Sequence, residues 1–117
     1  MGRKKIELAG LRVLVADSQW LLAHETVSQL HREGVEVEGP VATVQAAIDI
    51  VRRGPLDAAI VEAGLRGGDL AGLRALLAAK AIPVAWIAEA GQGDATRFDR
   101  GADAAQFLRA LLAPDFS

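Results

Sequence analysis

The hydrophobic pattern of this 117-residue chain changes its period several times, from the short apolar runs of strands to the 3.6-residue spacing of helices. Residues 11–16 (LRVLVA) are a run rich in β-branched side chains. Apolar residues then recur at Trp20, Ala23, Val27 and Leu30. The first segment predicts a buried strand and the second predicts a helix with one apolar face. This alternation constrains the fold more than any other feature of the chain.

The same alternation continues as far as residue 88. We expect further strands at residues 35–39, 58–62 and 82–88. Thr43 is placed to cap a helix that ends at Gly54, and four leucines at helical spacing predict another helix after the loop 63–69. The resulting order βαβαβαβ predicts a parallel sheet with helices on both faces, joined by right-handed crossovers.

Composition and length agree with this class. The chain is 51% hydrophobic, mostly through Ala, Leu and Val, with two Trp, three Phe and no Tyr. Such a composition favours helices packed on an aliphatic sheet over an aromatic β-sandwich. A chain of this length is the usual size of one domain. We expect a solvated tail at residues 1–10 and a single domain at residues 11–114.

Charge and cysteine content limit the function classes. The net charge is −2, and the only basic run is GRKK near the start, so we expect no nucleic-acid partner. The chain has no cysteine, which rules out disulfides and thiolate metal sites and is compatible with the cytoplasm. No apolar run approaches the roughly 20 residues of a membrane span. We therefore expect a cytoplasmic protein that makes no membrane contact.

The pattern weakens after Ala88, where the chain becomes polar and rich in glycine. One interpretation has a crossover reduced to a loop, a short strand near residues 96–98, and a final helix. The other makes residues 94–100 a helix and residues 104–108 the last strand. We favour the first, because the last apolar residues recur at helical spacing. These residues are Ala104, Phe107, Leu108 and Leu111.

Polar residues follow the predicted strands where each strand ends. Asp17 and Ser18 follow the first strand, Glu62 ends the third, and Ala88 ends the fourth. In an open parallel α/β sheet, ligands bind at the carboxyl ends of the strands. We therefore expect Asp17 and Glu62 to lie near each other at the rim of a potential site.

Residues 11–88 resemble the receiver domain of bacterial two-component response regulators. The resemblance lies in the strand "LRVLVA" leading into Asp17, in the segment "EGPVATVQAA", and in "LDAAIVE" ending at Glu62. It implies an α/β, doubly wound parallel sheet of the flavodoxin-like receiver fold, with strand order 2-1-3-4-5. In this chain we expect the fourth crossover helix to be shortened or missing.

The resemblance also implies a phosphorylation site, and this chain departs from it at each position. The phosphoacceptor aspartate is replaced by Glu62, and one member of the acidic pair that helps to hold magnesium is replaced by Ser18. The Ser or Thr after the fourth strand is replaced by Ala88. No lysine follows Lys80, so the lysine before a cis-proline is absent. The degenerate site that we assign comprises Asp17, Ser18, Glu62, Ala88 and Arg100.

These departures argue against phosphorylation. The Glu62 side chain is one methylene longer than Asp, which displaces its carboxylate from the position required for in-line phosphoryl transfer. Its permanent charge suggests either a receiver fixed in one state or a decayed site, and without Thr or Lys partners the charge has no obvious group to attract. We expect no cofactor; Asp17 and Glu62 are weak candidate magnesium ligands.

The sequence therefore predicts a non-enzymatic, stand-alone receiver-like domain that binds another signalling protein or a second copy of itself. We expect the contact surface on the remodelled segment 89–101 and the final helix, where a homodimer would cover an exposed sheet edge. The predicted surface residues are Trp86, Phe98, Phe107, Leu108 and Leu111. One alternative is a phosphoryl-accepting receiver that uses Glu62 or Asp17 with magnesium, and another is a small-molecule binder in the same crevice.

Other candidate motifs indicate structure more than chemistry. His24 and His31 are seven residues apart, not the four that place two metal ligands on one helix face, so we expect surface histidines. The segment 64–72 (GLRGGDLAG) lacks the Lys-Ser/Thr of a phosphate-binding loop and is expected to link a strand to a helix. Trp20 and Trp86 are expected to pack in the core or at its rim, because nothing basic surrounds them in the sequence.

Overall fold

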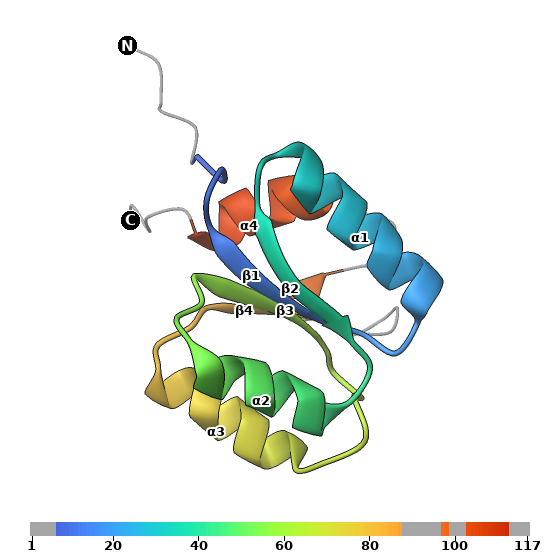
Figure 1. Cartoon of the computed structure of the whole chain (residues 1–117), viewed down its shortest axis with the longest axis vertical. Helices are drawn as coiled ribbons and strands as arrows, with labels where there is room; N and C mark the ends of the chain where they lie inside the picture. Colours follow the sequence, from blue (N-terminus) through green and yellow to red (C-terminus); the bar gives the residue numbers. More distant parts are fainter. Residues whose placement is uncertain (1–6, 88–96, 99–102, 113–117) are drawn as a thin grey trace.

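The computed structural model describes residues 7–87, 97–98 and 103–112, and these form an α/β sandwich (Figure 1). Strands and helices alternate in the order that the hydrophobic periods predict. The elements are β1 (Arg12–Ala16), α1 (Trp20–Arg32), β2 (Glu36–Val41), α2 (Val44–Arg53), β3 (Ala58–Glu62), α3 (Leu70–Ala79), β4 (Val84–Ile87), β5 (Arg97–Phe98) and α4 (Ala104–Leu112).

The sheet is entirely parallel in the order β2-β1-β3-β4, and the two-residue β5 pairs with β4 at its edge. Val13 pairs with Ala58, and Glu62 at the end of β3 pairs with Ile87 at the end of β4. Because all strands run the same way, their carboxyl ends meet at one edge of the sheet. The predicted parallel α/β architecture is confirmed.

The strands β1, β3 and β4 contribute alternate side chains to two separate cores. On β1, Val13 and Val15 face α1 and α4, whereas Leu14 and Ala16 face α2 and α3. Figure 1 shows these two helix pairs on opposite sides of the sheet. Since both faces are covered, the internal positions of the central strands β1 and β3 are apolar, as in parallel strands generally, whereas the edge strand β2 carries Glu36 and Glu38. In β1 and β3 a carboxylate can therefore be placed only where the strand ends.

Local contacts set the helix boundaries. The side chain of Thr43 accepts a hydrogen bond from Ala46 N at 3.2 Å and caps α2, as the sequence predicts. Asp69 caps α3 in the same way by accepting from Gly72 N at 3.0 Å. These caps satisfy backbone N–H groups that have no partner within the helix.

The β1–β2 pairing is irregular between Leu14 and Ala16, at the level of Gly39. Gly39 has φ of +110°, and a Cβ atom there would lie 2.6 Å from the carbonyl oxygen of Val15, so only glycine fits. Beside it, Arg12 Nη2 donates to Glu38 Oε2 at 2.9 Å, and this contact raises the pKa of Arg12 above its ordinary value.

The two interpretations of the last thirty residues are now distinguished. Residues 97–98 form the short strand β5, and residues 104–112 form the final helix, so these two parts of the favoured interpretation are confirmed. The alternative with a strand at residues 104–108 is wrong. The predicted loss of the fourth crossover helix concerns residues 88–96, which lie outside the described part of the chain.

The predicted boundary of the domain at residue 11 needs correction. Leu8 is fully buried in the core between the sheet and α1, and Gly10 N donates to Gly34 O at 2.9 Å. The packed unit therefore includes residues of the expected tail, because a single leucine there fills space that the regular elements leave open. Among the described helices, none is long and apolar enough to cross a membrane.

The burial of Leu8 makes a stability prediction. Leu8→Ala removes a completely buried side chain and should lower the free energy of unfolding by about 2 to 5 kcal/mol in urea titrations. The matched control is Leu21→Ala, at a leucine that is 69% exposed, which should change it by less than about 0.5 kcal/mol. Equal effects of the two substitutions would show that residues before Leu11 do not belong to the folded unit.

Candidate functional site

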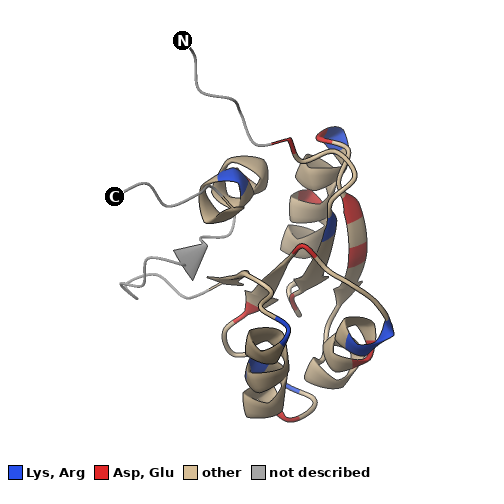
Figure 2. Ribbon diagram, turned by 90° about the vertical axis from the view of Figure 1, so that its left-hand side faces the viewer, with Lys and Arg blue, Asp and Glu red and all other residues tan. Residues whose placement is uncertain are grey.

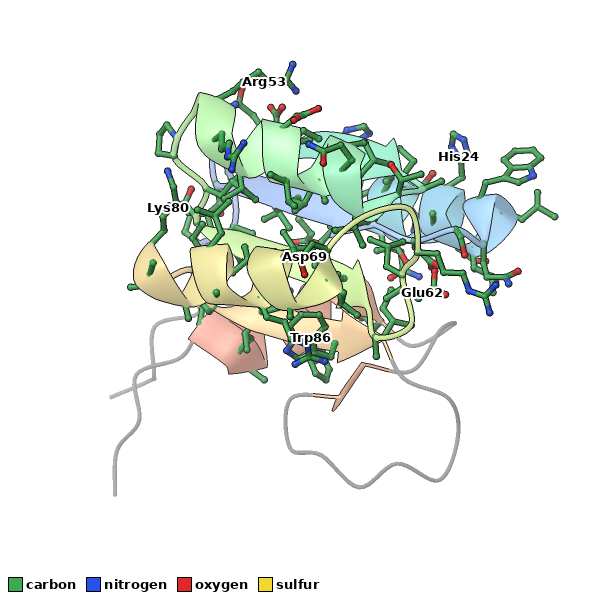
Figure 3. The ribbon with its side chains drawn as sticks, turned by 90° about the horizontal axis from the view of Figure 1, so that it is seen from below. His24, Arg53, Glu62, Asp69, Lys80 and Trp86 are labelled. Carbon is green, nitrogen blue, oxygen red and sulfur yellow. The ribbon has the colours of Figure 1, made fainter. Side chains whose placement is uncertain are left out.

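The carboxyl ends of β1 and β3 bring together the acidic residues that the sequence singles out. Glu62 is the last residue of β3 and is half-buried, and Asp17 and Ser18 follow β1 directly. Ala63 N, after Glu62, donates to Ile87 O at 2.8 Å, which ties the end of β3 to β4. The predicted site rim thus lies at one edge of the sheet, where Figure 3 labels Glu62.

Ser18 holds the Glu62 carboxylate with two donors. Its backbone N–H donates to Glu62 Oε1 at 2.8 Å, and its hydroxyl donates to the same oxygen at 2.7 Å. Hydrogen bonds to an ionised acceptor are short and stronger than neutral ones. The expectation that the charge has no group to attract is therefore wrong. In the receiver pattern an acidic residue stands at the position of Ser18. In this chain Ser18 is instead the hydrogen-bond partner of Glu62.

Asp17 is fixed within the loop beside this contact. It is only 2% exposed, its Oδ1 accepts from Gln19 N at 3.0 Å, and its backbone N–H donates to Val41 O at 2.9 Å. The loop that presents Ser18 is thus held by β2 on one side and by Glu62 on the other. Because the loop leads directly into α1, these contacts also set where that helix begins.

Asp17 and Glu62 are the sequence-based candidates for a magnesium site. Within the described residues no group of three or more His, Cys, Asp or Glu side chains is arranged to hold a metal ion. Magnesium requires near-octahedral oxygen coordination. Glu62 Oε1 already accepts both donors of Ser18, so binding a cation through that oxygen would compete with the contact that orders the loop.

Two residues of the predicted degenerate site, Ala88 and Arg100, lie outside the described residues, as does the side chain of Phe98. The rest of the predicted contact surface does not form one patch. Leu108 is fully buried, and Phe107 and Leu111 pack against the core under α1 and α4. Trp86 packs on the opposite core, under α2 and α3.

The final helix α4 packs against α1 of the same domain. Ala104 N donates to Gln29 Oε1 of α1 at 2.6 Å, and Arg109 pairs with Glu33 at the end of α1. The apolar side of α4 faces the sheet, where its residues complete the core. The prediction that Leu108 forms part of a binding surface is wrong, since the spacing that identifies the helix also identifies its buried face.

The two tryptophans behave differently from expectation. Trp86 is half-buried as predicted, but the Arg74 guanidinium lies over its ring with Cζ 4.1 Å from the centroid, so a basic residue does accompany it. Trp20 is 64% exposed and lies outside both cores. Trp20 is the first residue of α1. It has the helical spacing of the buried residues Ala23 and Val27, but its side chain does not reach the core.

Trp20 and Leu21 are the functional candidates that sequence reasoning missed. Leu21 is 69% exposed beside Trp20, and the ring of His24 meets Trp20 edge to face with centroids 5.4 Å apart. The sequence could have predicted the exposure of Leu21. A position two residues from the buried Ala23 is turned by about 200° around the helix, so it faces away from the core. His24 and His31 are both exposed, as predicted.

Residues 70–72 of the glycine-rich segment 64–72 form the first turn of α3, and the rest of the segment links β3 to that helix, as predicted. It lies against the start of α2, where Val44 N donates to Arg66 O at 2.8 Å and Gln45 N donates to Gly67 O at 3.1 Å. A Cβ atom at Gly67 would lie 2.8 Å from the side chain of Thr43. Glycine is therefore explained by this close packing, with no need for a bound phosphate.

Comparison with known proteins adds no family to this geometry. No protein-family model matches the chain, and no curated protein sequence matches it.

The Ser18–Glu62 contact can be measured by a double-mutant cycle. Ser18→Ala removes the hydroxyl donor, and Glu62→Ala removes the acceptor of both hydrogen bonds. We expect the two changes to be non-additive in urea unfolding, with a coupling free energy of about 0.5 to 1 kcal/mol, because the contact is near solvent. Ser28→Ala on the exposed side of α1 should show no coupling to Glu62→Ala. Additive effects of Ser18→Ala and Glu62→Ala would contradict the contact.

Proposed function

We propose that this chain is a cytoplasmic receiver-like signalling domain that acts through protein–protein contacts and without phosphoryl transfer. The parallel order β2-β1-β3-β4, with β5 at the β4 edge and helices on both faces, supports a flavodoxin-like receiver fold. The resemblance of residues 11–88 to receiver domains supports the signalling role. The proposal assigns no enzymatic activity to the domain.

The engagement of Glu62 by Ser18 is the observation that carries the proposal. A receiver becomes phosphorylated when a carboxylate oxygen at this position attacks the phosphorus of a donor in line with the leaving group. Here Oε1 accepts two hydrogen bonds, and the longer side chain displaces the whole carboxylate. The contact joins the ends of β1 and β3 without any phosphoryl group. This favours a domain fixed in one state over a decayed site.

The fixed state would act through the start of α1. Ser18 lies two residues before Trp20, so the Glu62 contact helps to place the two exposed apolar side chains Trp20 and Leu21. Adjacent exposed apolar residues beside a polar site are typical of a surface that another protein covers. A permanent carboxylate would thus do structurally what a transient phosphoryl group does in a regulated receiver.

The proposal predicts that the protein does not accept a phosphoryl group. Incubated with magnesium and acetyl phosphate, the protein should show no gain of phosphoryl mass by intact mass spectrometry, because Glu62 is held by Ser18 and displaced from the attacking position. Glu62→Asp restores the shorter carboxylate, so it tests whether length alone prevents the reaction; with Ser18 still present we expect at most a small gain.

A gain of one phosphoryl group in the wild-type protein would contradict the proposal. If Glu62→Gln abolished that gain, Glu62 would be the acceptor and the domain would be an active receiver. If Asp17→Asn abolished it instead, the acceptor would be Asp17.

A further inference from the structure

Helix α3 has an outer face unlike that of its neighbour. Its ten residues include a single charged residue, Arg74, and that side chain is stacked on Trp86. Surface helices normally carry polar residues on the side away from the core. Figure 2 shows charged residues on α2 but almost none on α3. The exposed residues of α3, apart from Arg74, are Ala71, Ala75, Ala78 and Ala79.

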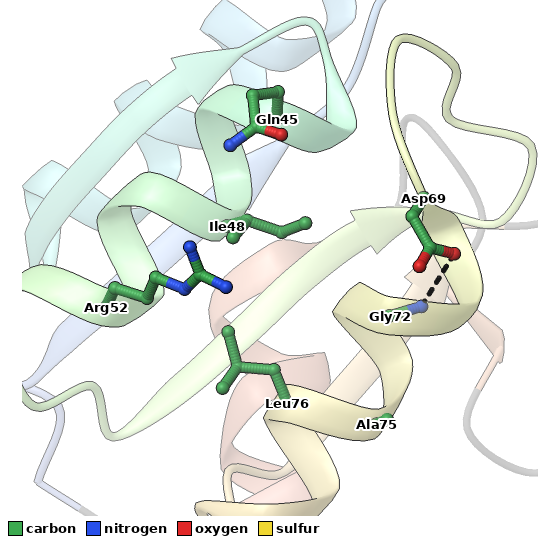
Figure 4. Close-up of a pocket in the computed structure, with 7 residues that line it drawn as sticks. All are labelled: Gln45, Ile48, Arg52, Asp69, Gly72, Ala75 and Leu76. Atoms are coloured by element: carbon green, nitrogen blue, oxygen red, sulfur yellow. Dashed lines mark hydrogen bonds between the residues drawn. The ribbon is translucent and has the colours of Figure 1, made fainter.

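A groove of about 480 Å³ runs between this face and α2 (Figure 4). Ile48 and Leu76 line its apolar part, and Gly72 and Ala75 form the wall on α3. Arg52 borders it from α2 and forms no ion pair with any described residue. The apolar surface of α3 therefore continues into a concave strip, a shape that a packed helix can fill.

The charges at the two ends of α3 are opposite. Asp69 precedes the helix and Lys80 follows it, and Figure 3 places them at opposite ends of α3. Both are exposed, and Asp69 uses Oδ1 to cap the helix, which leaves Oδ2 free to meet a cation. Arg53, in the last turn of the neighbouring α2, adds positive charge at the Lys80 end (Figure 3), and Arg52 lies in the same turn.

This charge arrangement complements itself when a copy of the helix is reversed. If two α3 helices pack antiparallel about a two-fold axis near Ala75, Asp69 of each copy lies opposite Lys80 of the other. The positive N-terminal end of each helix dipole then lies beside the negative C-terminal end of the other, which is favourable. An interface of this kind uses the same patch on both copies. A positive end, an apolar middle and a negative end on one face thus fit a second copy of this chain.

We infer that the face formed by α2 and α3 is a homodimer interface, with the two α3 helices antiparallel and centred near Ala75. The interface lies on the side of the sheet opposite α1 and α4. It therefore replaces the sheet edge and final helix that the sequence suggested for a homodimer. The inference does not depend on the proposed function, because neither Glu62 nor Trp20 takes part in it.

Sedimentation velocity of the full chain over a concentration series tests this interface. We expect reversible dimers, since a contact between two helix pairs is at the small end of stable interfaces. Ala75→Glu places two like charges near the axis and should raise the dimer dissociation constant at least tenfold. The control, Ser28→Glu, adds the same charge at an exposed position of α1 and should leave it unchanged. Circular dichroism and urea unfolding of each variant establish that the monomer is intact.

A charge reversal tests the orientation of the helices. Lys80→Glu should weaken the dimer, because it places a carboxylate opposite Asp69 of the other copy. Adding Asp69→Asn should restore part of the affinity, since Asn removes the repulsion and still caps the helix. A wild-type protein that is monomeric at all concentrations would overturn the inference. So would dimers that respond to Ala75→Glu and Lys80→Glu no more than to Ser28→Glu.

Discussion

The parallel sheet is covered by helices on both faces, and the rest of the structure depends on this constraint. Every internal position of β1 and β3 is apolar because both cores must be filled, so a carboxylate can be accommodated only at the end of a strand. Glu62 occupies that position. There the loop after β1 lies within reach, and Ser18 supplies two donors to the same oxygen. One requirement of packing thus fixes the place of the polar contact that joins the ends of β1 and β3.

Much of this architecture could be predicted, because the signals that specify it are periodic. The βαβ alternation, the Thr43 cap, the short β5 and the final helix all depend on local spacing and turn residues. The partners of individual side chains could not be predicted. Leu8 fills a space in the core that other elements create, and Arg74 reaches Trp86 from a different element of the chain. In the sequence Ser18 only marks the absence of an acidic residue. The loop conformation, which the sequence does not reveal, brings its N–H and hydroxyl to the Glu62 carboxylate.

Leu108, which the sequence placed on a contact surface, is buried for a related reason. An apolar stripe marks the side of a helix that is buried, so the residues that made α4 recognisable are those least available to a partner. The available apolar surface lies instead where the stripe does not run, at Trp20 and Leu21 and on the outer side of α3. These two surfaces are separate. A dimer through α3 would leave Trp20 and Leu21 exposed, so the two proposed contacts are compatible with each other.

The central claim is that a permanent Glu62–Ser18 contact replaces phosphoryl chemistry in setting the loop before α1. The amide resonance of Ser18 in a ¹H–¹⁵N NMR spectrum reports this contact directly. The account predicts a resonance that moves strongly in Glu62→Ala and does not move when magnesium and acetyl phosphate are added to the wild-type protein. A Ser18 amide that shifts on addition of magnesium and acetyl phosphate, or that is unaffected by Glu62→Ala, would contradict it.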